Sequence, residues 1–153
     1  MAEILVVDDD PDIRTLIRLT LESYGYQVRE AGDGLEALDA LGERAPDAMV
    51  LDVMMPRMDG YGVLRAMRQQ ELAPHTRVLV LTCKTEERDF MRGWELGADD
   101  YRTKPFEPEE LVEHLQDLLR TTQDVLHGRR QAELEKAELL DRLESAFSRP
   151  TRG

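Results

Sequence analysis

The chain has 153 residues and a formal net charge of −12 at pH 7, and this length is typical of one domain rather than two. Hydrophobic residues make up 41% and charged residues 34% of the sequence, a balance that supports one buried core and excludes a fibre or a membrane-embedded protein. No apolar run approaches the ~20 residues of a bilayer-spanning helix, and the first residues lack the basic leader and cleavage site of a signal peptide. We therefore expect a cytoplasmic protein with no membrane contact.

The charge distribution and the cysteine content exclude two further classes of protein. Residues 1–120 carry the whole net charge of −12, while residues 121–153 hold six basic and six acidic residues. Neither part has the cluster of cations that a phosphate backbone attracts, so we expect no direct contact with nucleic acid. Cys83 is the only cysteine, which excludes an internal disulfide and a Cys-rich zinc site.

Short strand-like runs alternate with longer helical patterns, which is the sequence sign of a parallel sheet covered on both faces. The expected strands are residues 4–7, 27–30, 48–51, 78–81 and, more weakly, 100–103. Three of these runs are almost wholly apolar, as central strands require, whereas Val28 stands among polar residues in a way typical of an edge strand.

Residues that favour a helix start precede four of the helical patterns: Asp10, Asp33, Thr85 and Glu107. Asp99 and Asp100 are expected to be solvated residues before the fifth strand. The elements follow one another as five βα units. We predict an α/β fold, a doubly wound five-stranded parallel sheet over residues 1–121.

Residues 122–147 continue as a charged helical pattern that contains leucines. One row at seven-residue steps is apolar throughout, namely Leu118, Val125, Ala132, Leu139 and Ala146. The second row of a coiled coil is mostly polar, and Gly128 either weakens one helix or separates two. We predict a C-terminal helical extension that covers the domain or forms a homodimer through residues 118–147, followed by a disordered tail over residues 148–153.

Polar side chains follow the apolar strands at the point where each strand ends. Asp8 and Asp9 follow the first strand, Asp52 the third, Thr82 the fourth, and Lys104 comes just after the fifth. Ligands of open α/β sheets bind outside the carboxyl ends of the strands. The sequence therefore predicts that these groups meet at one rim of the sheet.

Three carboxylates at one rim repel one another unless a cation lies among them. Mg²⁺ suits Asp8, Asp9 and Asp52, because it accepts carboxylates, a backbone carbonyl and waters. The Lys104 ammonium and the Thr82 hydroxyl can then bind the oxygens of a phosphoryl group. One carboxylate can act as a nucleophile and form an aspartyl phosphate.

These motifs together resemble the receiver domain of two-component response regulators. They are the pair Asp8 and Asp9, the segment 52–56 with Asp59 and Gly60, then Thr82, and finally Tyr101 with Lys104, Pro105 and Phe106. They occur in order over residues 2–120. The resemblance implies a flavodoxin-like sheet with strand order 2-1-3-4-5.

The resemblance also implies roles for the acidic rim. Asp52 would accept a phosphoryl group from a histidine kinase or a histidine phosphotransfer protein. Asp8, Asp9, Asp52 and the backbone carbonyl of Met54 would hold Mg²⁺. Lys104 would pair with the phosphoryl group, and its peptide bond to the following proline would be cis.

Thr82 and Tyr101 would form the switch pair of such a receiver. Movement of Thr82 toward the phosphoryl group opens a space for Tyr101 and reshapes the surface of residues 86–120. We expect this surface to contact a downstream protein. Cys83 stands where the family has a very small residue, which predicts an unusual phosphoryl lifetime together with Met54 and Lys84.

Two other functions compete with a phosphoacceptor that has no external product. The first is a Mg²⁺-dependent phosphohydrolase of the haloacid dehalogenase type, with Asp8 as nucleophile, Asp10 as acid, and Asp99 and Asp100 as metal ligands. It leaves Asp52 without a role, and no hydroxyl residue follows Asp10 where that class has one. The second is a receiver scaffold that has lost phosphorylation, although all the acceptor residues are present.

Overall fold

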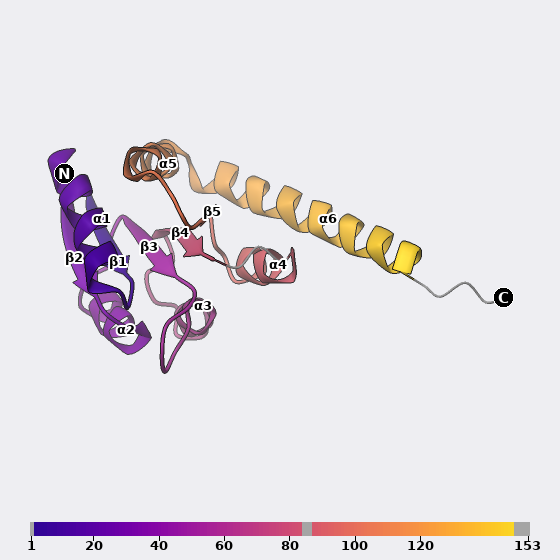
Figure 1. Cartoon of the computed structure of the whole chain (residues 1–153), viewed down its shortest axis with the longest axis horizontal. Coiled ribbons are helices and arrows are strands. Elements are labelled where there is room, and N and C mark those ends of the chain that lie inside the picture. Colours follow the sequence, from indigo (N-terminus) through magenta and orange to yellow (C-terminus); the bar gives the residue numbers. More distant parts are fainter. Residues whose placement is uncertain (1, 84–86, 149–153) are drawn as a thin grey trace.

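The computed structural model describes residues 2–83 and 87–148 as a parallel sheet with helices on both faces and one long helix beyond it (Figure 1). The strands are β1 (Glu3–Val7), β2 (Gln27–Ala31), β3 (Ala48–Asp52), β4 (Arg77–Thr82) and β5 (Asp100–Thr103). The helices are α1 (Pro11–Ser23), α2 (Gly34–Glu43), α3 (Gly60–Gln69), α4 (Glu87–Glu95), α5 (Pro108–Arg120) and α6 (Gln123–Ser148). Within the described part of the chain, no helix is both long and apolar enough to cross a membrane.

The sheet has the order β2-β1-β3-β4-β5, and every pair of neighbours is parallel. This confirms the predicted doubly wound, flavodoxin-like topology. β1 and β3 are buried along their whole length, while four of the five residues of the edge strand β2 are exposed or half-buried. The apolar and mixed strand sequences therefore match the central and edge positions that they occupy.

Two apolar clusters lie on opposite faces of the sheet because successive side chains of a strand point in opposite directions. Ile4 and Val6 of β1 belong to the cluster that includes residues of α1 and α5. Leu5 and Val7 belong to the cluster that includes residues of α2 and α3. Both faces of the sheet are thus covered, which holds the carboxyl ends of the strands in a fixed arrangement.

Side-chain caps explain where three of the helices begin. Asp10 accepts a hydrogen bond from the backbone N–H of Asp12 at 2.9 Å, and Asp33 accepts one from Glu36 at 2.8 Å, as expected. Asp59 caps α3 through the N–H of Gly62 at 2.8 Å, a role that the sequence reading did not assign to it. The side chain of Glu107 makes no capping hydrogen bond, and the cap expected at Thr85 lies outside the described residues.

The long helix α6 corrects three expectations about the C-terminal segment. It is continuous from Gln123 to Ser148, so the alternative of two helices separated at Gly128 is wrong. Ser148 belongs to this helix and not to the predicted tail, and the other residues of that tail lie outside the described part of the chain. Leu126 and Ala137 are buried, whereas Val125 and Leu139 of the predicted apolar row are about half exposed. The helix therefore packs on the domain through Leu126 and Ala137 and not through the predicted row.

Gly60 at the start of α3 allows the helix to pack directly on the end of β3. A Cβ at this position would lie 2.5 Å from the carbonyl oxygen of Asp52. The N–H of Gly60 donates to the carbonyl of Val53 at 2.9 Å. This contact fixes the chain that follows Asp52.

We predict that Gly60→Ala lowers the free energy of unfolding by about 2 kcal/mol, because the added methyl group meets backbone atoms that cannot move aside. Gly42→Ala is the matched control, since nothing lies within 4 Å of the Cβ position, and it should raise stability by up to about 1 kcal/mol. Urea unfolding followed by circular dichroism measures both. Equal effects of the two substitutions would contradict the tight contact.

Candidate functional site

Three carboxylates meet at the carboxyl edge of the sheet, as the strand pattern predicts. Asp8 follows β1 and Asp52 ends β3, and these strands are neighbours, with Val7 opposite Leu51. Carboxylate oxygens of Asp8, Asp9 and Asp52 all lie within 4.8 Å of one another. Asp8 and Asp52 are buried, whereas Asp9 is exposed. The arrangement can hold a metal ion that is reached from solvent beside Asp9.

Lys104 brings a positive charge to the buried side of this cluster. Its Nζ lies 3.2 Å from an oxygen of Asp8 and 3.4 Å from an oxygen of Asp52. Its backbone N–H donates to the carbonyl of Thr82 at 2.9 Å, which ties the loop after β5 to the end of β4. The peptide bond to Pro105 is cis, as the resemblance implied.

The charges at the rim are not balanced among these residues. Burial raises the pKa of Asp52 to about 6, and the negative charge of Asp8 adds to this rise, while Lys104 opposes it. Burial favours the neutral form of Lys104, but the charges of Asp52 and Asp8 outweigh it and raise the pKa of Lys104. Lys104 brings one positive charge against three negative ones, so a cation at the cluster would be strongly stabilised.

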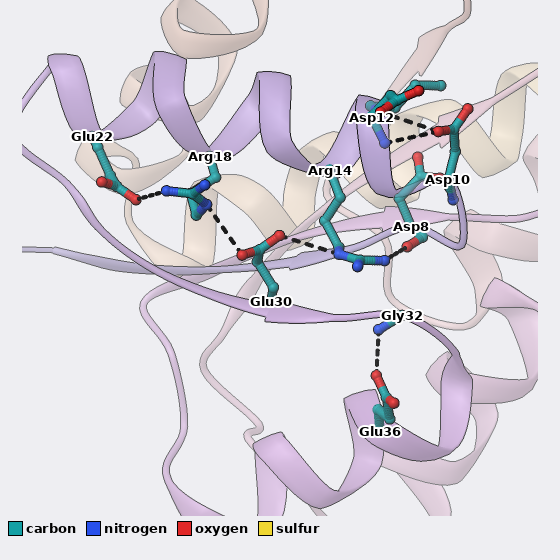
Figure 2. Close-up of polar contacts among 10 residues, drawn as sticks. Asp8, Asp10, Asp12, Arg14, Arg18, Glu22, Glu30, Gly32 and Glu36 are labelled. Carbon is teal, nitrogen blue, oxygen red and sulfur yellow. Dashed lines mark hydrogen bonds and ion pairs between the residues drawn. The ribbon is translucent and has the colours of Figure 1, made fainter.

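The backbone of Asp8 is held by an ion-pair network on the edge of the sheet. Figure 2 shows Arg14 between the carbonyl oxygen of Asp8, to which it donates at 2.8 Å, and the carboxylate of Glu30 at 3.1 Å. Glu30 also pairs with Arg18 at 3.1 Å. The N–H of Asp10 donates to one oxygen of Asp8 at 2.9 Å, so both oxygens of that carboxylate have partners. The sequence did not predict this role of Arg14, because its two partners lie in separate segments of the chain.

The loop after β3 forms the outer wall of the site. The N–H of Met54 donates to Asp52 at 3.3 Å, and the Met54 side chain is exposed. A hollow of about 410 Å³ opens here, lined by Asp9, Val53, Met54, Met55, Pro56 and Asp59. Of the three clustered carboxylates, Asp9 is the one that lines this hollow.

The expected switch residues lie on neighbouring strands at and below the rim. Thr82 is buried at the end of β4, one residue beyond Leu81, the partner of Asp52. Tyr101 in β5 packs on Trp94 of α4 with 5.4 Å between ring centroids, and its hydroxyl occupies the place that a Cβ of Gly93 would take. Tyr101 therefore packs toward α4 in this structure. Cys83 is exposed, and Lys84 lies outside the described residues.

Asp99 lies at the amino end of the strands, opposite the acidic rim. This position corrects two expectations from the sequence, namely that Asp99 is solvated and, in the phosphohydrolase alternative, that it binds metal beside Asp8. Asp99 is buried, not solvated, and accepts a hydrogen bond from the N–H of Val78 at 2.9 Å at the amino end of β4. Asp100 is half-buried and is the first residue of β5, which confirms the strand expected over residues 100–103 but not the expectation that Asp100 is a solvated residue before it. The phosphohydrolase alternative requires Asp99 and Asp100 as metal ligands beside Asp8. It also requires Asp10 as the acid, but the side chain of Asp10 caps α1. The structure does not bring that set together.

The fold and the rim together define a flavodoxin-like α/β domain with an acidic pocket at the carboxyl ends of its strands. The sequence pattern of the response regulator receiver domain matches residues 4–116. The chain therefore belongs to the receiver domain family of response regulators.

Individual relatives agree with this assignment. The alkaline phosphatase synthesis transcriptional regulatory protein PhoP of Bacillus subtilis is 48% identical over 121 residues, which are 79% of this chain and 50% of PhoP. The solved chemotaxis protein CheY4 of Vibrio cholerae matches with a TM-score of 0.73 and 38% identity over 77% of this chain and 98% of CheY4.

A third relative is the receiver domain of the sensor histidine kinase PA1611 of Pseudomonas aeruginosa, solved with a magnesium ion in its active-site cleft. It matches with a TM-score of 0.71 and 33% identity over 78% of this chain and 98% of that domain. The chain spans about half the length of the curated relatives that it matches.

We predict that Asp52→Asn raises the stability of the protein near pH 7 in the absence of divalent ions. Because the folded pKa of Asp52 is about 6 and the ordinary value is 3.8, the unfolded chain loses this proton first as the pH rises. The Asp52 charge therefore destabilises the fold increasingly between about pH 4 and pH 6, by at most about 3 kcal/mol.

Urea unfolding near pH 7 and about pH 4 tests this sign. The advantage of Asp52→Asn should be mostly lost at the lower pH, where Asp52 is protonated in the folded state and about half protonated in the unfolded state. Asp12→Asn, on the exposed side of α1, is the control and should show no such pH dependence. A variant at Asp52 that is less stable than the wild type near pH 7 would contradict the raised pKa.

Proposed function

We propose that this chain is a phosphoacceptor of a two-component phosphorelay, in which Asp52 takes a phosphoryl group from a phosphohistidine. The donor is a histidine kinase or a histidine phosphotransfer protein. The observation that carries the proposal is the convergence of three carboxylates within 4.8 Å, with Lys104 Nζ 3.4 Å from Asp52. An oxygen of Asp52 attacks phosphorus, and the bond from phosphorus to the imidazole nitrogen breaks.

The donor set fits Mg²⁺, since it consists of hard oxygen ligands. Asp8, Asp9, Asp52 and the backbone carbonyl of Met54 would hold the ion. When bound, the ion supplies positive charge to the phosphoryl oxygens. The raised pKa of Asp52, caused first by burial and then by the charge of Asp8, supports this assignment, because a bound cation would offset both effects. The magnesium-bound relative PA1611 supports it as well.

Lys104 and Thr82 would recognise the transferred group. The Lys104 ammonium already lies between Asp8 and Asp52 and would bind a phosphoryl oxygen attached to Asp52. The Thr82 hydroxyl would move toward a second oxygen, and Tyr101 would follow into the space that it leaves. The output would then be a change in the surface of α4, β5 and α5.

The proposed output is contact with another protein rather than catalysis or direct binding to nucleic acid. The curated relatives include transcriptional regulators about twice as long as this chain, so this part of the proposal rests on the chain's own charge. Its net charge of −12 repels a phosphate backbone. Residues 1–121 would form the receiver, and residues 122–147 the helical extension.

We predict that acetyl phosphate with Mg²⁺ adds one phosphoryl group to the chain and that Asp52→Asn abolishes this addition. Lys104→Ala should slow it roughly 100-fold, because it removes a charge that stabilises the developing phosphoryl oxygens. Asp12→Asn is the control and should react like the wild type. Intact-protein mass spectrometry over time measures the product.

Modification of the Asp52→Asn variant at the wild-type rate would refute the acceptor assignment. A wild-type chain that takes up no phosphoryl group, while remaining folded by circular dichroism, would favour the scaffold alternative.

We also propose a homodimer through α6. Leu139, Leu143 and Phe147 recur at four-residue intervals and therefore share one side of the helix; the exposed fractions of their side chains are 52%, 45% and 87%. An exposed apolar row on one side of a charged helix can be buried against a partner helix. A second copy of α6 offers the same row and is the occupant that we propose.

Sedimentation equilibrium is expected to show a dimer for the wild type and a monomer for the double variant Leu143→Glu and Phe147→Glu, since both would place charge in the apolar row. The control is Glu138→Gln together with Asp141→Asn, which changes charge beside the row and should keep the dimer. A wild type that stays monomeric over the whole concentration range, with or without beryllofluoride, would remove the dimer proposal.

A further inference from the structure

The expected output surface is already covered by a segment of the same chain. α6 begins shortly after α5 and crosses the side of the domain where β5 and α4 lie (Figure 1). Its first turns are anchored, because Leu126 is fully buried in the cluster that contains Leu118. Beyond this anchor, α6 packs against α4. The helix thus occupies the surface that a downstream protein would need.

An ion pair fastens the N-terminal third of α6 to the domain. Arg130 pairs with Asp99, and the two side chains are 18% and 4% exposed. The other oxygen of Asp99 accepts the N–H of Val78, so the carboxylate is fixed in place. Breaking such a pair by removing one partner leaves a buried charge without compensation. The contact is therefore specific in geometry, and removal of Arg130 would leave Asp99, among the described residues, with only the nearby charge of Arg68.

The next turns of α6 cover the switch side chain without filling the space above it. A pocket of about 550 Å³ separates the helix from the domain. Its lining on the helix side is Glu133, Lys136, Ala137 and Leu140, and its lining on the domain side includes Trp94, Tyr101 and Phe106. Loosely packed surfaces gain less dispersion energy than a close-packed core. The Arg130 ion pair, the packing on α4 and the buried Ala137 hold this stretch, and the unfilled pocket beneath it reduces the contact that is lost when the stretch separates from the domain.

We infer that α6 is a releasable cover of the α4, β5 and α5 surface, fastened by Arg130 and Asp99, and that its release is coupled to phosphoryl occupancy at Asp52. The inference rests on the function proposed above and names how that site is regulated. Tyr101 provides the connection, since it borders the pocket under α6 and is the residue expected to move when Asp52 is occupied. Coupling is reciprocal, so a chain whose cover is already released must bind a phosphoryl mimic more tightly.

Trp94 makes the release measurable, because it is the only tryptophan and it lines the covered pocket. With Mg²⁺ and beryllofluoride, the full-length wild type should show stronger acrylamide quenching and a red-shifted emission of Trp94. Arg130→Ala removes the ion pair, and Ala137→Glu places a charged side chain at a buried position of the helix. Both variants should show the exposed Trp94 signal without beryllofluoride.

Isothermal titration calorimetry of the same proteins gives the affinity for beryllofluoride independently of Trp94. Arg130→Ala and Ala137→Glu should each bind it at least about fivefold more tightly than the wild type, because they no longer have to release the helix. Arg129→Ala is the matched control, since Arg129 pairs with the exposed Asp117, and its affinity should stay within about twofold of the wild type. Ala137→Glu leaves the buried Asp99 with its Arg130 partner, so it separates release of the helix from the effect of an uncompensated charge in the domain.

Three results would overturn the inference. The first is an exposed Trp94 in both variants together with an affinity for beryllofluoride equal to that of the wild type, which would show that the cover and the site are independent. The second is binding of beryllofluoride to the wild type without any change at Trp94. The third is a Trp94 that stays covered in both variants. A wild type that binds no beryllofluoride at all would instead overturn the proposed function, and the coupling with it.

Discussion

The mutual repulsion of three carboxylates at one edge of the sheet is the constraint on which the rest of this structure depends. Asp8 and Asp52 are buried beside each other, and the Lys104 ammonium compensates only part of their charge. A cation bound at the cluster would relieve this repulsion. The proposed magnesium ion and phosphoryl chemistry follow from this electrostatic deficit more directly than from the fold, because doubly wound sheets serve many unrelated functions.

The surrounding fold keeps the repelling groups together. The parallel pairing of β1 with β3 sets the spacing of the acidic residues, and the close contact of Gly60 with the end of β3 fixes the chain beyond Asp52. Arg14 holds the backbone of Asp8 from the side of the edge strand. The same rigidity allows a local event at the rim to reach α6, since packed elements shift between discrete arrangements instead of deforming gradually.

Local sequence patterns predicted the strands and the acidic rim, but not the contacts between distant segments. Apolar runs that end in Asp8 or Asp52 were sufficient to predict the acidic rim, because parallel strands bring their carboxyl ends to one edge of the sheet. Asp99 and Arg130 form an ion pair although they are 31 positions apart in the sequence. The sequence around Asp99 does not reveal this partner, because acidic residues before a strand are also typical of a solvated loop. The predicted apolar row of α6 is not the row that contacts the domain, for a related reason. A helix with apolar residues on two sides does not reveal which side packs on the domain.

A crystal structure of the full chain with Mg²⁺ and beryllofluoride tests the central claim most directly. The account predicts one magnesium ion held by oxygens of Asp8, Asp9, Asp52 and the Met54 carbonyl. It also predicts beryllofluoride on the Asp52 carboxylate, with the Lys104 ammonium against a fluorine. Side chains of Asp8, Asp9 and Asp52 that point apart with no ion among them, or beryllofluoride bound to another aspartate, would contradict it.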